Sequence, residues 1–447
     1  MKFEPIITRN VGVPDAWEIE VYLARGGYQA VRKALTEYTP DQIIEIVSRA
    51  NLRGRGGAGF PTGRKWSLIP KNAPQTYLVC NADESEPGTF SNHDLLIWDP
   101  HLLIEGMIIG AYAIRATTGF IYLRGEFGLA ARRLERALAQ ARAHGFLGPR
   151  ILGTEYSLEI YLFRGAGAYI CGEETALLES IEGNRPMPRP RPPYYPPAIG
   201  LYGKPTAVNN VETLCNVPFI VLNGPEWYLS IGNPPKNPGT KVFSISGLVR
   251  RPGNYEAPLG TTLGELIFEY AGGLHEGRRF KAVTPGGTST PLLTDQHLDV
   301  KMDYDSLPAV GTYLGSTGMI VMDDTVCIPC AVHRMSTFYR HESCGKCTPC
   351  REGTDWLLRL LQRVERGEGR ARDLELLEDV ADNIAGKTLC AFGDAAATPV
   401  LSTLRLFRAE YEAHVREGRC PLPAPWRRAE VGAPADRGGR GNGGHAH

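Results

Sequence analysis

Five segments decide the fold: QTYLVCNADES (75–85), HLLIEGMIIGAYAIRA (101–116), GFIYLRGE (119–126), AARRLERALAQARAHG (130–145) and LEIYLFRGAGAY (158–169). The first, third and fifth are short apolar runs of the kind that form buried strands. The second and fourth have apolar residues at helical spacing, and the fourth ends on a glycine, a common helix terminator. Strands and helices that alternate in this order predict an α/β fold with an open, largely parallel sheet flanked by helices.

The pattern changes on both sides of these segments. Residues 15–50 have helical spacing, and residues 185–197 hold seven prolines, which predict an extended loop because proline lacks the backbone donor of helices and sheets. From residue 240, short β-like runs such as TKVFSISGLV surround one expected helix, TLGELIFEYAGG (262–273). Residues 335–417 again have apolar residues three and four apart, which indicates helices.

These changes predict four parts of the chain. We expect an α/β domain over residues 1–238, a small α+β domain over 239–328 and a helical domain over 329–425. The remaining residues, 426–447, are glycine-rich and lack apolar periodicity, so we expect a disordered tail.

Composition excludes several classes of protein. The 447 residues are 43% hydrophobic, which is enough for two to four packed domains. The 49 basic and 49 acidic side chains cancel, whereas a nucleic-acid-binding protein needs a basic surplus. The longest apolar stretch, residues 102–114, is too short to span a bilayer, and the first residues show no secretory signal. We therefore expect a protein of a reducing interior, where cysteines serve as ligands or buried thiols.

The segment HESCGKCTPCR (341–351) has the most informative spacing in the chain. Three cysteines separated by two residues each, Cys344, Cys347 and Cys350, can curl around a [4Fe-4S] cluster. Cys390 is the best candidate for the fourth ligand, because the chain can return to it after two predicted helices. Cys350 also lies where a helix is expected to begin, and helix N-termini favour negative charge.

A zinc site is the alternative. Cys327 and Cys330 form a second C-x2-C pair, which would complete a four-cysteine site with Cys344 and Cys347. That arrangement leaves Cys350 without a role. The other cysteines are expected to be packed thiols: Cys80, Cys171, Cys215 and Cys420.

Two glycine-rich loops are candidates for ligand binding. RGRGGAGF (53–60) has four glycines in six positions, and the backbone N–H groups of such a loop can cradle phosphate, with Lys65 adding charge. It matches neither the dinucleotide fingerprint nor the P-loop, so a simple turn is the alternative. The second loop, RGAGAYICGEE (164–174), leaves a predicted strand, where α/β sheets bind ligands. Its glutamates, Glu173 and Glu174, are also suited to stabilising a helix start.

A third loop, NADESEPG (81–88), concentrates three carboxylates directly after a strand. Such groups can hydrogen-bond the hydroxyls of a ribityl chain or a sugar. The alternatives are a solvated loop and, less well supported by spacing, a site for a hard metal ion.

Six motifs in this order resemble the NADH-binding flavoprotein subunit of proton-pumping NADH:quinone oxidoreductase, respiratory complex I. They are GRGGAGFPTGRKW (54–66), NADESEPGTF (81–90), RGAGAYICGEETAL (164–177), KPTAVNNVETL (204–214), ESCGKCTPCREG (342–353) and CAFGDAA (390–396). The resemblance covers residues 15–425. It implies that the α+β domain is a soluble-ligand-binding β-grasp domain and that the helical domain binds the iron–sulfur cluster.

The resemblance also implies the chemistry. NADH would give a hydride to noncovalent FMN, and electrons would pass singly to the [4Fe-4S] cluster. FMN would be held by Gly54, Gly56, Gly57, Lys65, Asn81, Asp83, Glu84, Gly172, Glu173, Asn209, Asn210 and Thr213. Phe60 would stack on the adenine of NADH, with Tyr195 as a further aromatic. Glu86, the expected catalytic residue, and Glu174 would lie in the nucleotide pocket.

By the same resemblance, the partners would be a thioredoxin-like [2Fe-2S] subunit and a large multi-cluster subunit, which pass electrons on to quinone. The complex would sit on the cytoplasmic side of the inner (plasma) membrane, without direct membrane insertion by this chain. Two alternatives remain at this point. One is the diaphorase subunit of an NAD-linked hydrogenase or formate dehydrogenase, and the other is a noncatalytic, zinc-stabilised ligand-binding protein.

Overall fold

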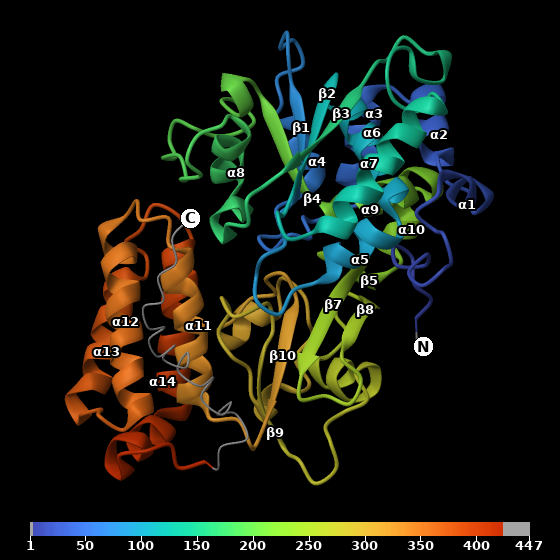
Figure 1. Cartoon of the computed structure of the whole chain (residues 1–447). Helices are drawn as coiled ribbons and strands as arrows, with labels where there is room; N and C mark the ends of the chain where they lie inside the picture. The colour runs from blue at the N-terminus through green and yellow to red at the C-terminus, as the bar shows by residue number, and fades with distance from the viewer. Residues whose placement is uncertain (1–2, 423–447) are drawn as a thin grey trace, which may run out of the picture.

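The computed structural model describes residues 3–422, so the expected tail at 426–447 lies outside the described residues. Its first sheet confirms the α/β prediction (Figure 1). The three expected strands are β1 (Tyr77–Ala82), β2 (Thr118–Leu123) and β3 (Glu159–Arg164), and β4 (Thr206–Asn210) joins them. All neighbouring strands are parallel, in the order β3-β2-β1-β4.

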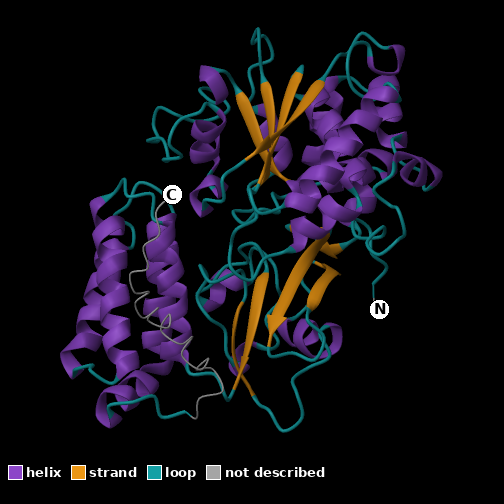
Figure 2. Ribbon diagram, in the orientation of Figure 1, coloured by secondary structure: helices purple, strands orange, loops and turns teal. Residues whose placement is uncertain are grey.

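Both faces of this sheet are covered, which explains the continuous apolar runs in the sequence. Leu78 and Cys80 of β1 point into the larger core, while Val79, between them, packs in a separate cluster on the opposite face with Val208 of β4. Figure 2 shows helices on both sides of the sheet. The strand order changes direction beside β1, since β2 and β3 lie on one side and β4 on the other. Sheets of this type bind ligands at the carboxyl ends of the strands where the order reverses.

Within residues 3–422, ten α-helices belong to the part of the chain that contains this sheet. They are α1 (Ile19–Ala24), α2 (Gln29–Glu37), α3 (Pro40–Arg49), α4 (Thr62–Ser67), α5 (Ser91–Trp98), α6 (Pro100–Ala113), α7 (Gly128–Ala143), α8 (Glu174–Ile181), α9 (Val211–Asn223) and α10 (Pro225–Leu229). Within the segment of helical spacing, α3 begins at a capping box formed by Thr39 and Gln42, with Pro40 in its first turn. Short 3₁₀ turns lie at Ile151–Gly153, Tyr169–Gly172, Leu201–Gly203, Asp295–His297 and Leu307–Val310.

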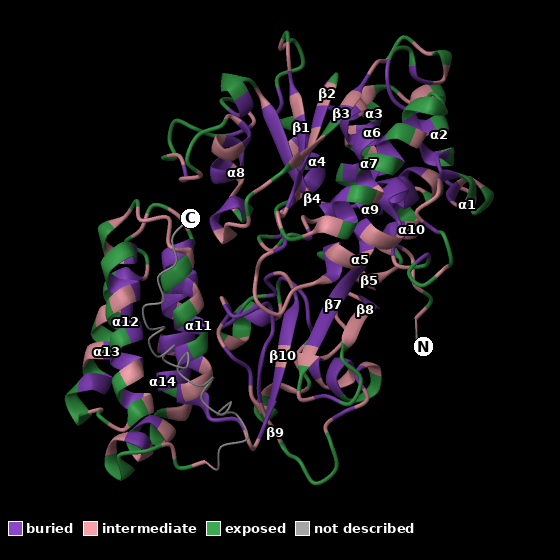
Figure 3. Ribbon diagram, in the orientation of Figure 1, coloured by how far each residue is buried: buried purple, intermediate pink, exposed green. Residues whose placement is uncertain are grey.

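The longest apolar stretch of the sequence forms α6, and every residue of this helix except Tyr112 is buried (Figure 3). The sequence suggested a helix with one apolar face, whereas the structure surrounds it on nearly all sides. Its one charge, Glu105, accepts hydrogen bonds from the N–H groups of Tyr28 and Ala30 at 2.9 Å, at the start of α2. Within residues 3–422, no single helix is long and apolar enough to cross a membrane, although the bent pair α5 and α6 would qualify together by length and composition.

A second sheet forms the α+β part of the chain. It contains β7 (Thr240–Gly247), β8 (Gly253–Pro258), β9 (Phe280–Thr284) and β10 (Gly318–Asp323) in the order β8-β7-β10-β9. The central pair, β7 and β10, is parallel, and both outer pairs are antiparallel. The helix expected over 262–273 is a shorter π-helix, Glu265–Tyr270. A two-stranded ribbon of β5 (Gly232–Asn233) and β6 (Asn237–Pro238) precedes this sheet.

The last described part is a bundle of four helices that lies beside the two sheet-containing parts (Figure 1). Its members are α11 (Ile328–Glu342), α12 (Thr348–Arg366), α13 (Ala371–Ile384) and α14 (Phe392–Glu417). α12 begins at Thr348 with Pro349 in its first turn, as the sequence predicts. The bundle therefore presents the start of α12, with Cys350, and the start of α14, which follows Cys390, as two helix N-termini.

Candidate active site

A cavity of about 480 Å³ lies at the carboxyl ends of β1 and β4, and all three parts of the chain line it. Ten residues singled out from the sequence are in its wall: Gly56, Gly57, Asn81, Asp83, Glu84, Glu86, Gly172, Glu173, Asn210 and Cys390. The two glycine-rich loops and the carboxylate loop, which are far apart in the sequence, thus meet at one place. This is the position at which the topology of the sheet predicts a ligand.

Hydrogen bonds hold the first glycine-rich loop in place. The N–H of Gly54 donates to the carbonyl of Phe60 at 2.9 Å, and the N–H of Arg55 donates to the hydroxyl of Thr213 at 2.8 Å. At Gly56 a Cβ atom would approach the Cβ of Asn210 to 3.0 Å, and Gly57 has a φ of +138°. Side chains are therefore disfavoured at both positions, at Gly56 by the close approach of Asn210 and at Gly57 by its backbone conformation, and both glycines line the cavity.

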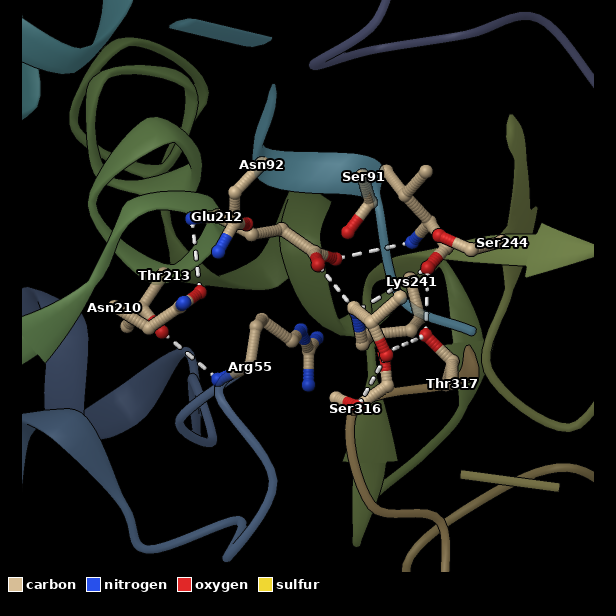
Figure 4. Close-up of polar contacts among 12 residues, drawn as sticks. Arg55, Ser91, Asn92, Asn210, Glu212, Thr213, Lys241, Ser244, Ser316 and Thr317 are labelled. Atoms are coloured by element: carbon tan, nitrogen blue, oxygen red, sulfur yellow. Dashed lines mark hydrogen bonds and ion pairs between the residues drawn. The ribbon is translucent and has the colours of Figure 1, made fainter. Parts of the chain in front are cut away.

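Arg55 supplies a buried positive charge in the cavity wall. Its side chain reaches from the loop into the space beneath α9 (Figure 4), and the residue is only 1% exposed. One nitrogen, Nη2, donates to the hydroxyl of Tyr228 and to the carbonyl of Pro238, at 2.8 and 2.9 Å. Its Nε and Nη1 are buried and have no hydrogen-bond partner among residues 3–422. Two orphaned donors on a buried cation fit an anionic group such as a phosphate.

A second buried cation, Lys241 of β7, is already neutralised. Its ammonium group pairs with Glu212 of α9, and each side chain is 1% exposed (Figure 4). Glu212 also accepts a hydrogen bond from the N–H of Val242 at 3.0 Å. Burial lowers the pKa of Lys241. Lys241 is thus compensated by Glu212, whereas Arg55, the other cation among the described residues of the wall, has tyrosine and carbonyl neighbours and two nitrogens without a hydrogen-bond partner.

The carboxylate loop contributes to the same cavity wall as the glycine-rich loop. Asp83 accepts a hydrogen bond from the hydroxyl of Ser85 at 2.8 Å, and burial raises its pKa to about 7. Glu84 accepts the N–H groups of Asn92 and His93 at the start of α5, at 2.7 and 2.9 Å, and burial raises its pKa to about 7. Both carboxyl groups line the cavity as hydrogen-bonding partners for hydroxyl or ring N–H groups.

Glu86 joins elements from two parts of the chain. Its carboxylate accepts hydrogen bonds from the hydroxyl of Tyr169, in the second glycine-rich loop, at 2.5 Å and from the N–H of Ser289 at 2.9 Å. Burial raises its pKa. The expected catalytic residue is therefore in the cavity wall, and a fixed network orients it.

The two glutamates of the second loop have different surroundings. Glu173 is the N-cap of α8 and accepts the N–H groups of Thr175 and Ala176, so the helix-capping function expected as an alternative is present. Glu174 pairs with Lys65 at 3.3 Å and with Arg191 of the proline-rich loop at 3.1 Å. Lys65 also donates to the carbonyl of Val208 in β4. These contacts place Lys65 and Glu174 beside the cavity instead of in its wall.

The remaining residues predicted from the sequence are also outside the cavity wall. Gly54, Asn209 and Thr213 support it from behind: Asn209, for example, accepts a hydrogen bond from the indole N–H of Trp66 at 2.9 Å. Phe60 and Tyr195 are 39% and 52% exposed, so their rings are accessible to a ligand. Sequence reasoning missed Arg55 and Lys241 and the contributions of the second sheet, including Ser289 and Tyr313. Of these residues, only Arg55 could have been identified from the sequence, because it lies inside the glycine-rich motif.

The four predicted cluster cysteines lie at one end of the helical bundle. Cys344 and Cys347 lie between α11 and α12, Cys350 in the first turn of α12, and Cys390 directly before α14; all four belong to one packed cluster. The Sγ of Cys347 accepts the N–H of Leu389 at 3.3 Å. Burial raises the pKa of Cys390 to about 12, and the thiols of Cys344 and Cys350 are close enough to add to it. Four cysteines gathered at one end of the bundle are the ligand set of a [4Fe-4S] cluster.

The alternative zinc site, which joined Cys327 and Cys330 to Cys344 and Cys347, is wrong. α11 has 15 residues and runs from Ile328 to Glu342, so Cys327 at its start and Cys344 beyond its end lie about 22 Å apart along the helix. Cys420, predicted to be a packed thiol, lies in a cluster of possible metal ligands. Its sulfur lies with ligand atoms of Cys327, Cys330 and His414, all within 4.8 Å of one another.

Comparison with known proteins places these observations in a family. Residues 47–219 match the Nuo51 FMN-binding domain, residues 242–293 the SLBB domain, and residues 330–414 the iron–sulfur binding region of NADH-ubiquinone oxidoreductase-F. Among solved structures, an NAD+-reducing [NiFe]-hydrogenase in the H2-reduced state is similar, with a TM-score of 0.81 and 36% identity over 92% of this chain and 67% of that chain.

Two curated relatives match nearly their whole length. An F subunit (F 2) of NADH-quinone oxidoreductase from Rhizobium meliloti is 54% identical over 421 residues, which is 94% of this chain and 100% of that protein. The corresponding F subunit from Mycobacterium bovis is also 54% identical, over 94% of this chain and 95% of that protein. With identity at this level along the length of both chains, and with the cavity and cysteines described above, this protein belongs to the family of F subunits of NADH-quinone oxidoreductase.

Proposed function

We propose that this chain oxidises NADH at the cavity and passes the electrons to a [4Fe-4S] cluster held by Cys344, Cys347, Cys350 and Cys390. One observation carries the proposal: the cavity wall contains both the glycine-rich loop, with Gly56 and Gly57, and Cys390. FMN, when bound, supplies the conversion that this chemistry needs, because it accepts a two-electron hydride and gives up electrons one at a time. A flavin in this cavity would lie directly beside a cluster ligand.

Different residues of the chain would bind different parts of FMN. The N–H groups of the loop at Gly56 and Gly57, with the unsatisfied guanidinium of Arg55, would hold the phosphate. Asn81, Asp83 and Glu84, elsewhere in the cavity wall, would accept hydrogen bonds from hydroxyl or ring N–H groups of FMN. The residues behind the wall keep the loop in position: Gly54, Lys65, Asn209 and Thr213.

NADH would enter over the exposed aromatic side chains. Phe60 would stack on the adenine and Tyr195 would add a second aromatic surface, since both rings are accessible. Glu174, at the start of α8, would face the ribose, and Glu86 would hold the nicotinamide end in the orientation for hydride transfer. The network from Tyr169 and Ser289 fixes the carboxylate of Glu86 for this purpose.

We further propose that the chain works within a larger assembly. A thioredoxin-like [2Fe-2S] subunit and a large multi-cluster subunit would carry electrons from the cluster to quinone, on the cytoplasmic side of the membrane. The relatives, which are named as F subunits of NADH-quinone oxidoreductase, support membership of such a complex. If this is right, the isolated chain reduces ferricyanide from NADH but does not reduce quinone, and co-purification from native membranes recovers both partners.

The similarity to the NAD+-reducing hydrogenase favours a second candidate, a diaphorase subunit of a soluble hydrogenase or formate dehydrogenase. The flavin and cluster chemistry would be the same in both. Recovery of the chain with a soluble hydrogenase or formate dehydrogenase, and without the membrane partners, would favour this second candidate.

Quantification of FMN, iron and sulfide in anaerobically purified protein tests the cofactors together. The proposal predicts one FMN, four iron atoms and four sulfides per chain, with the absorption of both flavin and iron–sulfur in the visible spectrum. Protein that is fully folded but lacks flavin and iron after anaerobic reconstitution would contradict it.

A further inference from the structure

We propose that Cys327, Cys330, His414 and Cys420 form a second metal site, which binds one zinc ion and closes the end of the helical bundle opposite the iron–sulfur cluster. One ligand atom of each residue lies within 4.8 Å of the others. Three thiolates and one imidazole are a donor set typical of structural zinc, and four protein ligands leave no position open for a substrate.

The local structure presents these four atoms without rearrangement. Cys327 is the N-cap of α11, and Cys330 follows in its first turn, so the C-x2-C spacing turns both sulfurs toward the same side. His414 lies in the last turn of α14. Cys420 follows the end of that helix at Gly418, whose φ of +60° reverses the chain direction.

His414 has the orientation of a metal-ligating histidine. Its Nδ1 is 2.8 Å from the carbonyl oxygen of Glu410 and donates a hydrogen bond to it. The other nitrogen, Nε2, is therefore the free acceptor, and it lies 3.3 Å from the Sγ of Cys327. A backbone acceptor on one ring nitrogen that fixes the other toward the metal is the usual outer-shell arrangement at zinc sites.

The position of the group indicates what the metal would do. The residue that orients His414, Glu410, also accepts the N–H of Ile328 at 3.1 Å and pairs with Lys281 of β9 at 2.6 Å. The site thus lies where the second sheet passes into α11 and where α14 ends. A bound zinc would fasten the first and last helices of the bundle to each other beside the adjoining sheet. Because α11 separates it from Cys344 by about 22 Å, it would not take part in cluster binding.

Metal analysis of the holoprotein tests this site independently of the flavin chemistry. Protein purified without added metal and dialysed should contain one zinc ion per chain in addition to its iron. The double variant Cys330→Ser/Cys420→Ser keeps only two of the four ligands and should lose the zinc while its iron and FMN contents stay unchanged. The reciprocal variant, Cys347→Ala, should lose iron and keep zinc. Cys215→Ala, a change to a buried thiol in α9, is the matched control and should keep both metals.

A second measurement keeps the proposal testable if the double variant folds poorly. Zinc removed from the wild-type protein with a chelator and replaced by Co²⁺ should give the thiolate charge-transfer and visible bands of a tetrahedral site, and the double variant should give none. Absence of both zinc and cobalt bands in wild-type protein would overturn the proposal. Retention of zinc in the double variant would also overturn the proposal. A Cys327–Cys330 disulfide in metal-free protein purified anaerobically would overturn it too.

Discussion

Gly57 combines a backbone conformation that side chains avoid with a place in the cavity wall. We expect Gly57→Val to lose FMN, because its side chain would project where the flavin must lie and the loop would be strained. Flavin content of the purified variant is the measurement. Gly145→Val is the matched control: Gly145 also has a positive φ, but it lies at the end of α7, away from the cavity, and this variant should retain FMN. Equal flavin content in the two variants would move the flavin away from this loop.

Glu174 should help to select NADH over NADPH. A 2′-phosphate near this carboxylate would bring like charges together, and Arg191 is already paired with Glu174. We expect Glu174→Gln to lower the ratio of kcat/KM for NADH to kcat/KM for NADPH by about tenfold. This is the order of magnitude expected when one unfavourable charge contact is removed. Glu179→Gln, on the same helix and paired with Arg189, is the control and should leave the ratio unchanged. An unchanged ratio in Glu174→Gln would place this residue outside the ribose pocket.

Asp83 should make the stability of the FMN-free protein depend on pH. Burial raises its pKa to about 7, whereas an unfolded chain has a pKa of about 3.9 for aspartate. Between these values the folded protein keeps a proton that the unfolded chain has released. The stabilisation is therefore complete below about pH 4 and is lost as the pH rises through about 7. This group should lower the thermal unfolding midpoint between about pH 4 and about pH 7, with little further change above pH 7, and the fall should be smaller in Asp83→Asn. Parallel declines in the two proteins would show that Asp83 does not contribute.

The sequence identified residues well where the ligands form a short motif. Cys344, Cys347 and Cys350 lie within seven positions, so their spacing alone indicated one site. His414 and Cys420 gave no such signal, because their partners, Cys327 and Cys330, lie more than 80 positions earlier in the sequence. Arg55 was named as part of a loop, but its unsatisfied nitrogens depend on surroundings that only the fold supplies.

Among the elements, α9 and β7 are joined by the buried pair of Glu212 and Lys241. Removal of one partner leaves the other charge buried and uncompensated, which typically costs about 3–5 kcal/mol. We expect Lys241→Met to lower the free energy of unfolding by this amount, measured with urea. The double variant Lys241→Met/Glu212→Gln should recover most of the loss, since glutamine can still accept the N–H of Val242. Arg49→Met, which breaks an exposed pair with Glu226, should cost no more than about 1 kcal/mol. A loss in Lys241→Met as small as that of Arg49→Met would contradict the importance of the buried pair.

Elements were predictable where periodicity and burial agree. β1, β2 and β3 are apolar runs because both faces of the sheet are covered, and α3 is marked by its capping box. β4 was not predicted, because the strand has only five residues, TAVNN, and ends in two asparagines. Asparagine is uncommon in strands, and the pair was interpreted as part of a ligand-binding motif. The segment over 262–273 has a helical pattern, but its helix is largely a six-residue π-helix, Glu265–Tyr270, which ends at Ala271.

At the scale of the whole molecule, the three parts meet at one cavity, and the sequence alone did not show this. The family resemblance implied the order of the domains, whereas the cavity wall depends on contacts such as those of Glu86 with Tyr169 and Ser289, which join loops far apart in the chain. The same arrangement brings Cys390 of the helical part to the glycine-rich loop of the first. If FMN occupies this cavity as proposed, its closeness to the cluster would depend on how the three parts pack together and not on any single motif.

The central claim is that electrons from NADH reach a [4Fe-4S] cluster on the four cysteines through a flavin in the adjoining cavity. EPR spectra of the isolated chain, frozen after anaerobic mixing with excess NADH and compared with those after dithionite, test it most directly. We predict the signal of a reduced [4Fe-4S] cluster in the wild-type protein, and its loss in Cys347→Ala, which should still contain FMN that NADH bleaches. The same cluster signal in Cys347→Ala and in wild-type protein, or flavin that NADH cannot reduce, would contradict the account.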